Sequence, residues 1–187
     1  LHFCDPGAKM LLVEVVEFAV SDTACTHHAV GVTRKIGNLP LRCQSSPGFL
    51  VNRVLGPYLD EAMRLYNEGV TAEVIDRAAR NFGMPMGPIH LADTVGLDIC
   101  LSVAENLGAD LGLNVPEELR KKVEAGELGV KSGKGFYKYQ NGKQVKTKTA
   151  TDSTGQRTDD NADRLVLQML NESIACLREG VIEDQDL

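Results

Sequence analysis

The first pattern in the chain is a continuous apolar run that holds one carboxylate. Residues 11–16 read Leu-Leu-Val-Glu-Val-Val, and a strand that is apolar on both faces is typical of a covered sheet. Glu14 would then be buried, and an unpaired buried charge is so unfavourable that a cation or hydrogen-bond donor should face it. His2, in the short apolar segment before a turn at Pro6 and Gly7, is one candidate.

A histidine beside a buried carboxylate has a recognisable chemistry. The carboxylate fixes the tautomer and leaves the second ring nitrogen free, which suits a general base near neutral pH. The same spacing also fits a Glu14 at an exposed sheet edge and a His2 at a frayed terminus. The pattern alone leaves both interpretations open.

The following residues complete the end of a sheet domain. A helix is predicted from Asp22 to Ile36 and a short strand from Leu39 to Cys43, so residues 1–45 form a strand, strand, helix, strand unit.

Residues 46–145 then become helical. Ser46 as N-cap and Pro47 at the first helical position predict a long helix, which Pro57 should kink. Asn52 interrupts the apolar stripe of this helix. Thr71 caps a second helix that ends at Gly83.

Further helices and a hairpin follow in the same segment. Helices are predicted after Pro88 and after Pro116, and Asn141-Gly142 predicts a tight hairpin between 135–140 and 143–148.

The composition changes again beyond this hairpin. Residues 146–163 contain no large apolar side chain and are predicted to be a polar linker. Residues 164–181 then align without gaps on 53–70, with six identities that include the ending Glu-Gly-Val. Two generic amphipathic helices could share that much, but the common register favours a duplicated unit, so 164–187 is predicted to be the first helix of a second, repeated helical domain.

The last helix carries an apolar stripe that needs cover. It should pack on the first helical domain or on another copy of the chain. The stripe comprises Leu165, Leu167, Met169, Leu170, Ile174 and Leu177.

Several motifs together resemble the 3-hydroxyacyl-CoA dehydrogenases of fatty-acid β-oxidation. They occur in that family's order along nearly the whole chain. These motifs are residues 2–6, 10–16, 46–53, 82–88, 93–98 and 129–139.

The resemblance implies roles for three residues. His2 matches the base that takes the proton from the substrate's 3-hydroxyl while hydride leaves for NAD, and Glu14 matches the glutamate that orients this histidine. Asn52 matches an asparagine that bonds near the reacting oxygens of the acyl-CoA substrate.

The implied fold is an α/β remnant, the last strands of a Rossmann-like domain, followed by a mostly α-helical dehydrogenase C-terminal domain. The second helical copy is similar to the multifunctional enzymes, whose other part is an enoyl-CoA hydratase. The chain is therefore expected to be an internal segment cut at both ends, lacking the N-terminal Rossmann and hydratase parts. The family is often dimeric, which makes a homodimer one candidate partner state, although the truncation removes the basis for carrying dimerisation over to this chain.

Two departures from the family bear on activity. Cys4 and Asp5 stand where the family has an aromatic residue and Asn or Ser, and no Gly-x-Gly-x-x-Gly loop follows a strand. NAD should therefore not bind tightly to this segment alone, because the pyrophosphate needs such a loop. The alternative function is a non-catalytic helical module for substrate binding or dimerisation, with a degraded site.

Composition limits which partners, metal sites and cellular locations can be expected. A net charge of −6 argues against nucleic acid as a partner, and no run of 18 apolar residues predicts a membrane span. Five scattered cysteines form no metal-type pair, so reduced thiols and no metal site are predicted. Cys4 lies close enough to His2 to be a nucleophile, but a small apolar residue in a buried strand explains it equally well. The expected location is intracellular: cytoplasmic in a bacterium, otherwise mitochondrial or peroxisomal.

Overall fold

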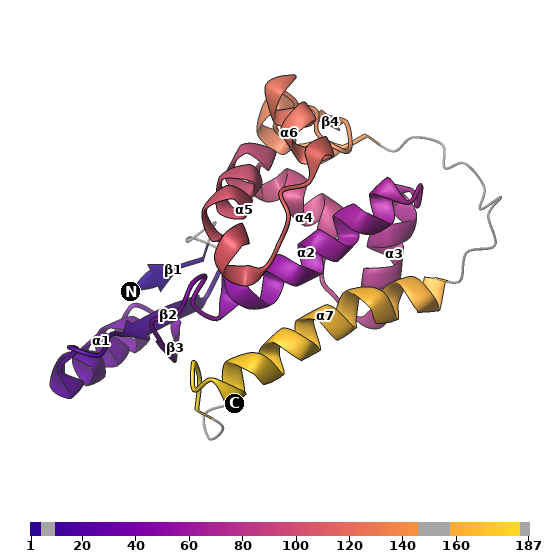
Figure 1. The fold of residues 1–187 in the computed structure, drawn as a ribbon. Coiled ribbons are helices and arrows are strands. Elements are labelled where there is room, and N and C mark those ends of the chain that lie inside the picture. Colours follow the sequence, from indigo (N-terminus) through magenta and orange to yellow (C-terminus); the bar gives the residue numbers. More distant parts are fainter. Residues whose placement is uncertain (5–9, 146–157, 184–187) are drawn as a thin grey trace. The chain divides into compact units, whose positions relative to one another are not determined.

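The computed structural model describes residues 1–4, 10–145 and 158–183 (Figure 1). The chain forms two compact units, one made of Leu1–Val54 with Asn171–Leu187 and the other of Leu55–Leu170. The predicted turn at Pro6 and Gly7 lies outside the described residues, as does most of the predicted linker. The predicted division of the sequence after residue 45 stays a prediction.

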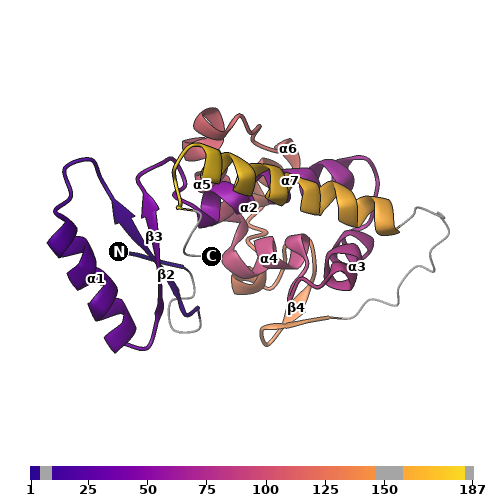
Figure 2. The same ribbon diagram turned by 90° about the horizontal axis from the view of Figure 1, so that it is seen from below.

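The first unit contains a three-stranded sheet in the order β1-β2-β3. Strand β1 (His2–Phe3) runs antiparallel to β2 (Leu12–Glu17), and β2 runs parallel to β3 (Leu39–Gln44). Helix α1 (Thr23–Lys35) connects the two parallel strands and lies along the sheet (Figure 2). The strand, strand, helix, strand order predicted from the sequence is confirmed.

Strand β2 is buried on both of its faces. Val13, Glu14 and Val15 are all buried, which explains why the sequence shows no alternation here. An apolar cluster in this unit contains Cys43 of β3, Cys176 and Val181.

The second unit is helical. Its core gathers around Tyr58, Leu65, Ile75 and Ile89, all fully buried. Its elements are the greater part of α2 (Val51–Asn67), α3 (Ala72–Phe82), α4 (Pro88–Val95), α5 (Leu97–Leu111), α6 (Glu117–Glu124), the 3-10 turn η1 (Val130–Ser132), the hairpin strands β4 (Tyr139–Gln140) and β5 (Lys143–Gln144), and the first part of α7 (Thr158–Arg178). No described helix is long and apolar enough to cross a membrane.

The start of α2 differs from the prediction. The helix begins at Val51 instead of Pro47, because Gly48 and Phe49 have φ angles of 76° and 51°, which a right-handed helix does not allow. Residues 46–50 form a turn instead, although the helix then continues through Pro57.

The sequence also missed a helix boundary. The helix predicted after Pro88 ends at Val95, and α5 starts directly after Gly96, whose φ is 109°. The hairpin at Asn141 and Gly142 is confirmed: both residues have positive φ, as a two-residue hairpin turn requires, although its strands are shorter than predicted.

Helix α7 begins at Thr158, so the last six residues of the predicted linker are helical. Its apolar stripe is covered in part: Leu165 and Met169 join the core of the second unit, and Leu177 packs in the Cys43 cluster of the first. Leu167, Leu170 and Ile174 remain about half exposed.

Helices α2 and α7 end in the same way, as their matching sequences suggest. In both, a positive-φ glycine, Gly69 or Gly180, is followed by a buried valine, Val70 or Val181. The valine amide donates to the carbonyl five residues earlier in each case. This is one helix-ending motif used twice.

The two helices also carry matching ion pairs. In the second unit, Arg164 of α7 binds Glu61 of α2 and Glu68, the residue after α2, each at 2.6 Å. In the first unit, Arg53 of α2 binds Glu172 at 2.6 Å and Glu179 at 2.7 Å. Residues that align in sequence thus exchange partners, which supports a duplicated helical unit.

Arg164→Gln is expected to weaken the acid sensitivity of the second unit. The hydrogen bond from Arg164 lowers the pKa of Glu68 below 4.5, so this carboxylate adds stability above that value and loses it as the pH falls through its folded pKa. Urea unfolding should show a smaller loss of unfolding free energy between about pH 5 and 3 in the variant than in the wild type. Arg120→Gln, which removes another partly exposed pair, with Glu105, should keep the wild-type slope. Equal slopes in all three proteins would show that the Glu68 pair adds nothing.

Candidate active site: a histidine–glutamate pair

The β1–β2 ladder places a histidine directly on a buried carboxylate. His2 and Glu14 are register partners, and His2 Nδ1 lies 2.6 Å from Glu14 Oε2. The Glu14 side chain is fully buried, whereas one third of the His2 side chain is exposed. With Nδ1–H donating to the carboxylate, Nε2 is the acceptor nitrogen of the neutral ring.

The other oxygen of Glu14 is held by the start of α2. The amides of Leu50 and Val51 donate to Glu14 Oε1 at 2.8 and 2.9 Å. Because these amides lie at the N-terminal end of α2, their partial positive charge favours the ionised carboxylate. Glu14 is thus fixed on both sides before it orients His2.

Phe49 makes this arrangement possible, and the sequence reasoning did not single it out. Its backbone is left-handed, which is rare for a bulky residue and occurs where neighbouring structure over-determines it. Its ring lies 5.4 Å from the His2 ring, centroid to centroid. Only the glycine before it, Gly48, signalled that the backbone departs from a helix here.

Arg53 ties the same turn to the end of α7. Its Nη1 donates to Ser46 Oγ at 2.9 Å, while its other two guanidinium nitrogens bind Glu172 and Glu179. Its own amide donates to the carbonyl of Gly48. The turn that aims the two amides at Glu14 is therefore braced by charged contacts.

Asn52 lies in the first turn of α2, directly after Val51, and is partly exposed. This position puts it one residue from the amides that hold Glu14. Its contact with substrate oxygens stays a prediction.

Cys4 is buried close to the pair. Burial and the charge of Glu14 raise the pKa of its thiol, which keeps the sulfur protonated and makes it a poor nucleophile. Asp5 lies outside the described residues. The other histidines lie elsewhere: His27 and His28 are exposed on α1, and His90 stacks on Tyr139 in the second unit.

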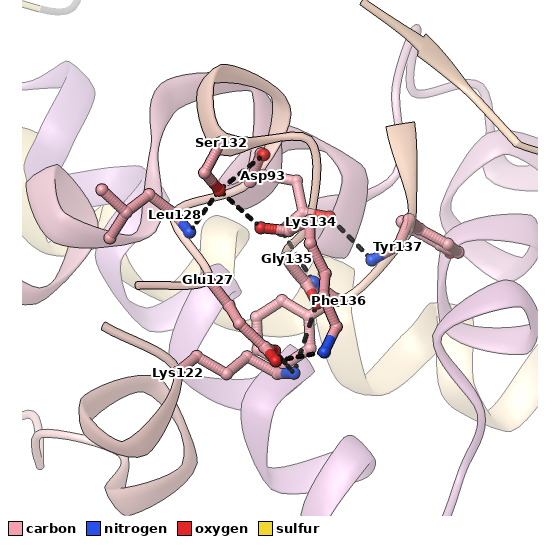
Figure 3. Close-up of polar contacts among 10 residues, drawn as sticks. Asp93, Lys122, Glu127, Leu128, Ser132, Lys134, Gly135, Phe136 and Tyr137 are labelled. Carbon is pink, nitrogen blue, oxygen red and sulfur yellow. Dashed lines mark hydrogen bonds and ion pairs between the residues drawn. The ribbon is translucent and has the colours of Figure 1, made fainter. Parts of the chain in front are cut away.

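Hydrogen bonds from side chains and backbone groups hold the glycine-rich segment at residues 129–135 and the residues that follow it (Figure 3). Asp93, fully buried, accepts hydrogen bonds from the Phe136 and Tyr137 amides and the Tyr139 hydroxyl, each at 2.9 Å. Ser132 Oγ bonds three backbone groups of the turn. The segment is a braced turn before the hairpin, and the amides of Gly129, Ser132, Gly133 and Gly135 already donate to backbone carbonyls.

A pyrophosphate site for NAD does not fit the connection between β2 and α1. The connection between β2 and α1 contains no glycine, and the Asp22 carboxylate already caps the helix by accepting from the Ala24 amide. A second negative group would be repelled at this helix start.

Comparison with known proteins identifies a matching domain family and several similar proteins. The family model described as 3-hydroxyacyl-CoA dehydrogenase, C-terminal domain, matches residues 48–139. Residues 48–139 therefore match this family's C-terminal domain. The chain is 38% identical over 195 residues to the fatty acid oxidation complex subunit alpha of Shewanella putrefaciens, covering 97% of the chain and 27% of that protein.

Two solved structures extend the similarity. FadB2 of M. tuberculosis is 37% identical with a TM-score of 0.70, over 74% of the chain and 51% of that protein. The dehydrogenase part of multifunctional enzyme 1 from C. elegans is 26% identical with a TM-score of 0.70, over 98% of the chain and 44% of that structure. The chain spans about a quarter of the length of the curated relatives it matches.

Proposed function

We propose that the protein containing this segment oxidises (S)-3-hydroxyacyl-CoA to 3-oxoacyl-CoA in fatty-acid β-oxidation, with His2 as the base. The observation that carries the proposal is the His2–Glu14 hydrogen bond, with Glu14 held by two further amides. Its sequence and structural relatives include a fatty acid oxidation subunit and a multifunctional enzyme.

The geometry supports the proton half of the reaction. His2 Nε2 accepts the proton of the substrate's 3-hydroxyl, and the new positive charge on the ring is stabilised by the buried Glu14 carboxylate. In the reverse direction, protonated His2 returns the proton to the oxygen of the 3-oxo group. Asn52, close to the same turn, is proposed to donate to this oxygen.

The hydride half needs groups other than those described. NAD would accept the hydride from C3 and would be held by a glycine-rich loop outside the described residues. We propose that this loop and a hydratase part belong to the same longer protein, because the chain covers only 27% of a curated relative's length. The hydratase would supply the 3-hydroxyacyl-CoA that the dehydrogenase consumes.

The test is oxidation of NADH by acetoacetyl-CoA in the longer protein. We expect substrate-dependent loss of NADH absorbance, with one 3-hydroxybutyryl-CoA formed for each NADH consumed. A control with acetoacetate in place of its CoA ester should show much slower turnover. A longer protein that binds acetoacetyl-CoA and NADH but leaves both unchanged would overturn the proposal and favour a non-catalytic helical module.

A further inference from the structure

Cys4 extends the His2–Glu14 pair to three donors on one face of the sheet. Side chains alternate along a strand, so Cys4 and His2 face the same side of the chain while Phe3 between them is exposed. Glu14, opposite His2 in the ladder, completes the group. One donor atom from each of the three residues lies within 4.8 Å of the other two.

We propose that His2, Cys4 and Glu14 form a zinc site that holds the pair in an inactive state. A thiolate, an imidazole and a carboxylate form a ligand set typical of Zn²⁺, and three protein ligands leave a fourth position for water. Calcium and magnesium prefer oxygen ligands alone, so the sulfur argues against them. The site is also largely shielded, because Cys4 and Glu14 are buried.

Binding requires only a small adjustment. Zinc bonds of about 2.0 Å to nitrogen and oxygen place tetrahedral ligands about 3.3 Å apart, whereas His2 Nδ1 and Glu14 Oε2 now lie 2.6 Å apart. The three donor atoms now lie within 4.8 Å of one another, and a zinc–sulfur bond of about 2.3 Å would place the sulfur about 3.5 Å from the other two ligands. Cys4 and the partly exposed His2 would both shift to admit the ion.

The protons balance without a redox step. The Cys4 thiol releases its proton as the zinc–sulfur bond forms, and zinc takes the place of the hydrogen on His2 Nδ1. That hydrogen moves to Nε2, the nitrogen that the proposed reaction needs as base. Zinc should therefore block the proton transfer, an effect that rests on the proposed function, whereas metal binding itself does not.

Cobalt titration of this 187-residue chain tests the site directly. Co²⁺ is expected to give a thiolate charge-transfer band in the near ultraviolet, which Zn²⁺ removes by displacement. Cys4→Ser and His2→Gln should each abolish the band, while Cys25→Ser, which changes an exposed cysteine on α1, should keep it. Circular dichroism confirms that the variants are folded, and an absent band, or one lost with Cys25, would overturn the proposal.

The inhibitory effect is tested in the longer protein. Zinc should lower NADH oxidation in the wild type, and EDTA should restore it. The ratio of rates with and without zinc should stay near one in Cys4→Ser, each protein compared with itself. Equal zinc sensitivity in both proteins would overturn the inactive state, whereas a cobalt band without any dehydrogenase activity would overturn the proposed function and leave the metal site standing.

Discussion

His2→Ala is expected to lower the turnover of the dehydrogenase by about 10²–10⁴-fold, the usual contribution of a general base. The loss should appear in kcat, because the proton moves only in the transition state. Stopped-flow oxidation of NADH by acetoacetyl-CoA, under saturating concentrations, measures it. The unfolding free energy should also fall, because Glu14 stays buried and loses one hydrogen-bond partner, so circular dichroism is needed to show that the variant is folded.

Glu14→Gln tests whether Glu14 orients the His2 ring, and it leaves the proposed base, His2, in place. Glutamine keeps the size of the side chain, and its oxygen can still accept from the Leu50 and Val51 amides. Its NH₂ group then faces His2 Nδ1, which must become the acceptor, so the ring proton moves to Nε2 and blocks the proposed base. Turnover should fall with the ring still in place.

His28→Ala is the matched control, because this histidine is exposed on α1. It should keep wild-type turnover. If His2→Ala also kept it, the general-base role would be wrong, and the His2–Glu14 bond would be structural only.

The sequence could name His2 as one candidate partner of Glu14, and the family resemblance then favoured it. A carboxylate inside an apolar strand needs a partner, and few polar side chains lie close enough in the chain to provide one. The ladder then places them in register. The sequence could not exclude an exposed edge, since burial on the second face comes from the rest of the fold.

The start of α2 could not be predicted because long-range contacts override a local preference. Ser46 and Pro47 are strong helix-start residues, yet the two amides at 50 and 51 bond Glu14, 36 and 37 residues away. That geometry requires the chain to turn with positive φ at Gly48 and Phe49 before the helix begins. The departure from the local rule occurs at the candidate site, where such conflicts are expected.

The repeat shows a similar limit. The alignment of Arg53 with Arg164 could be read from the sequence, as could the common Glu-Gly-Val ending. The exchange of partners between the two copies could not, because Arg53 reaches residues 119 and 126 positions away. Sequence identity indicates a repeated helix, but it does not indicate which residues of the two helices pair with each other.

Asp93→Asn is expected to lower the unfolding free energy by about 3 kcal/mol, the scale of lost hydrogen bonds to a buried charge. The two oxygens of Asp93 both accept: Oδ1 from the Phe136 amide, and Oδ2 from the Tyr137 amide and the Tyr139 hydroxyl. Either orientation of an asparagine amide turns its NH₂ toward at least one of these donors. A buried donor is then left unpaired, which is unfavourable beyond the loss of charge.

Urea unfolding followed by circular dichroism measures this change as a lower midpoint with an unchanged slope. Glu117→Gln is the matched control, because Glu117 is 80% exposed and pairs with Lys121 of its own helix; its effect should be negligible beside that of Asp93→Asn. Gly135 gives an independent check, since a Cβ there would overlap the Asp93 carboxylate. Gly135→Ala should therefore destabilise the wild type, and less so a chain that already carries Asp93→Ala, because the two changes act on one contact. If Asp93→Asn were as mild as Glu117→Gln, the turn would be held by packing and not by the carboxylate.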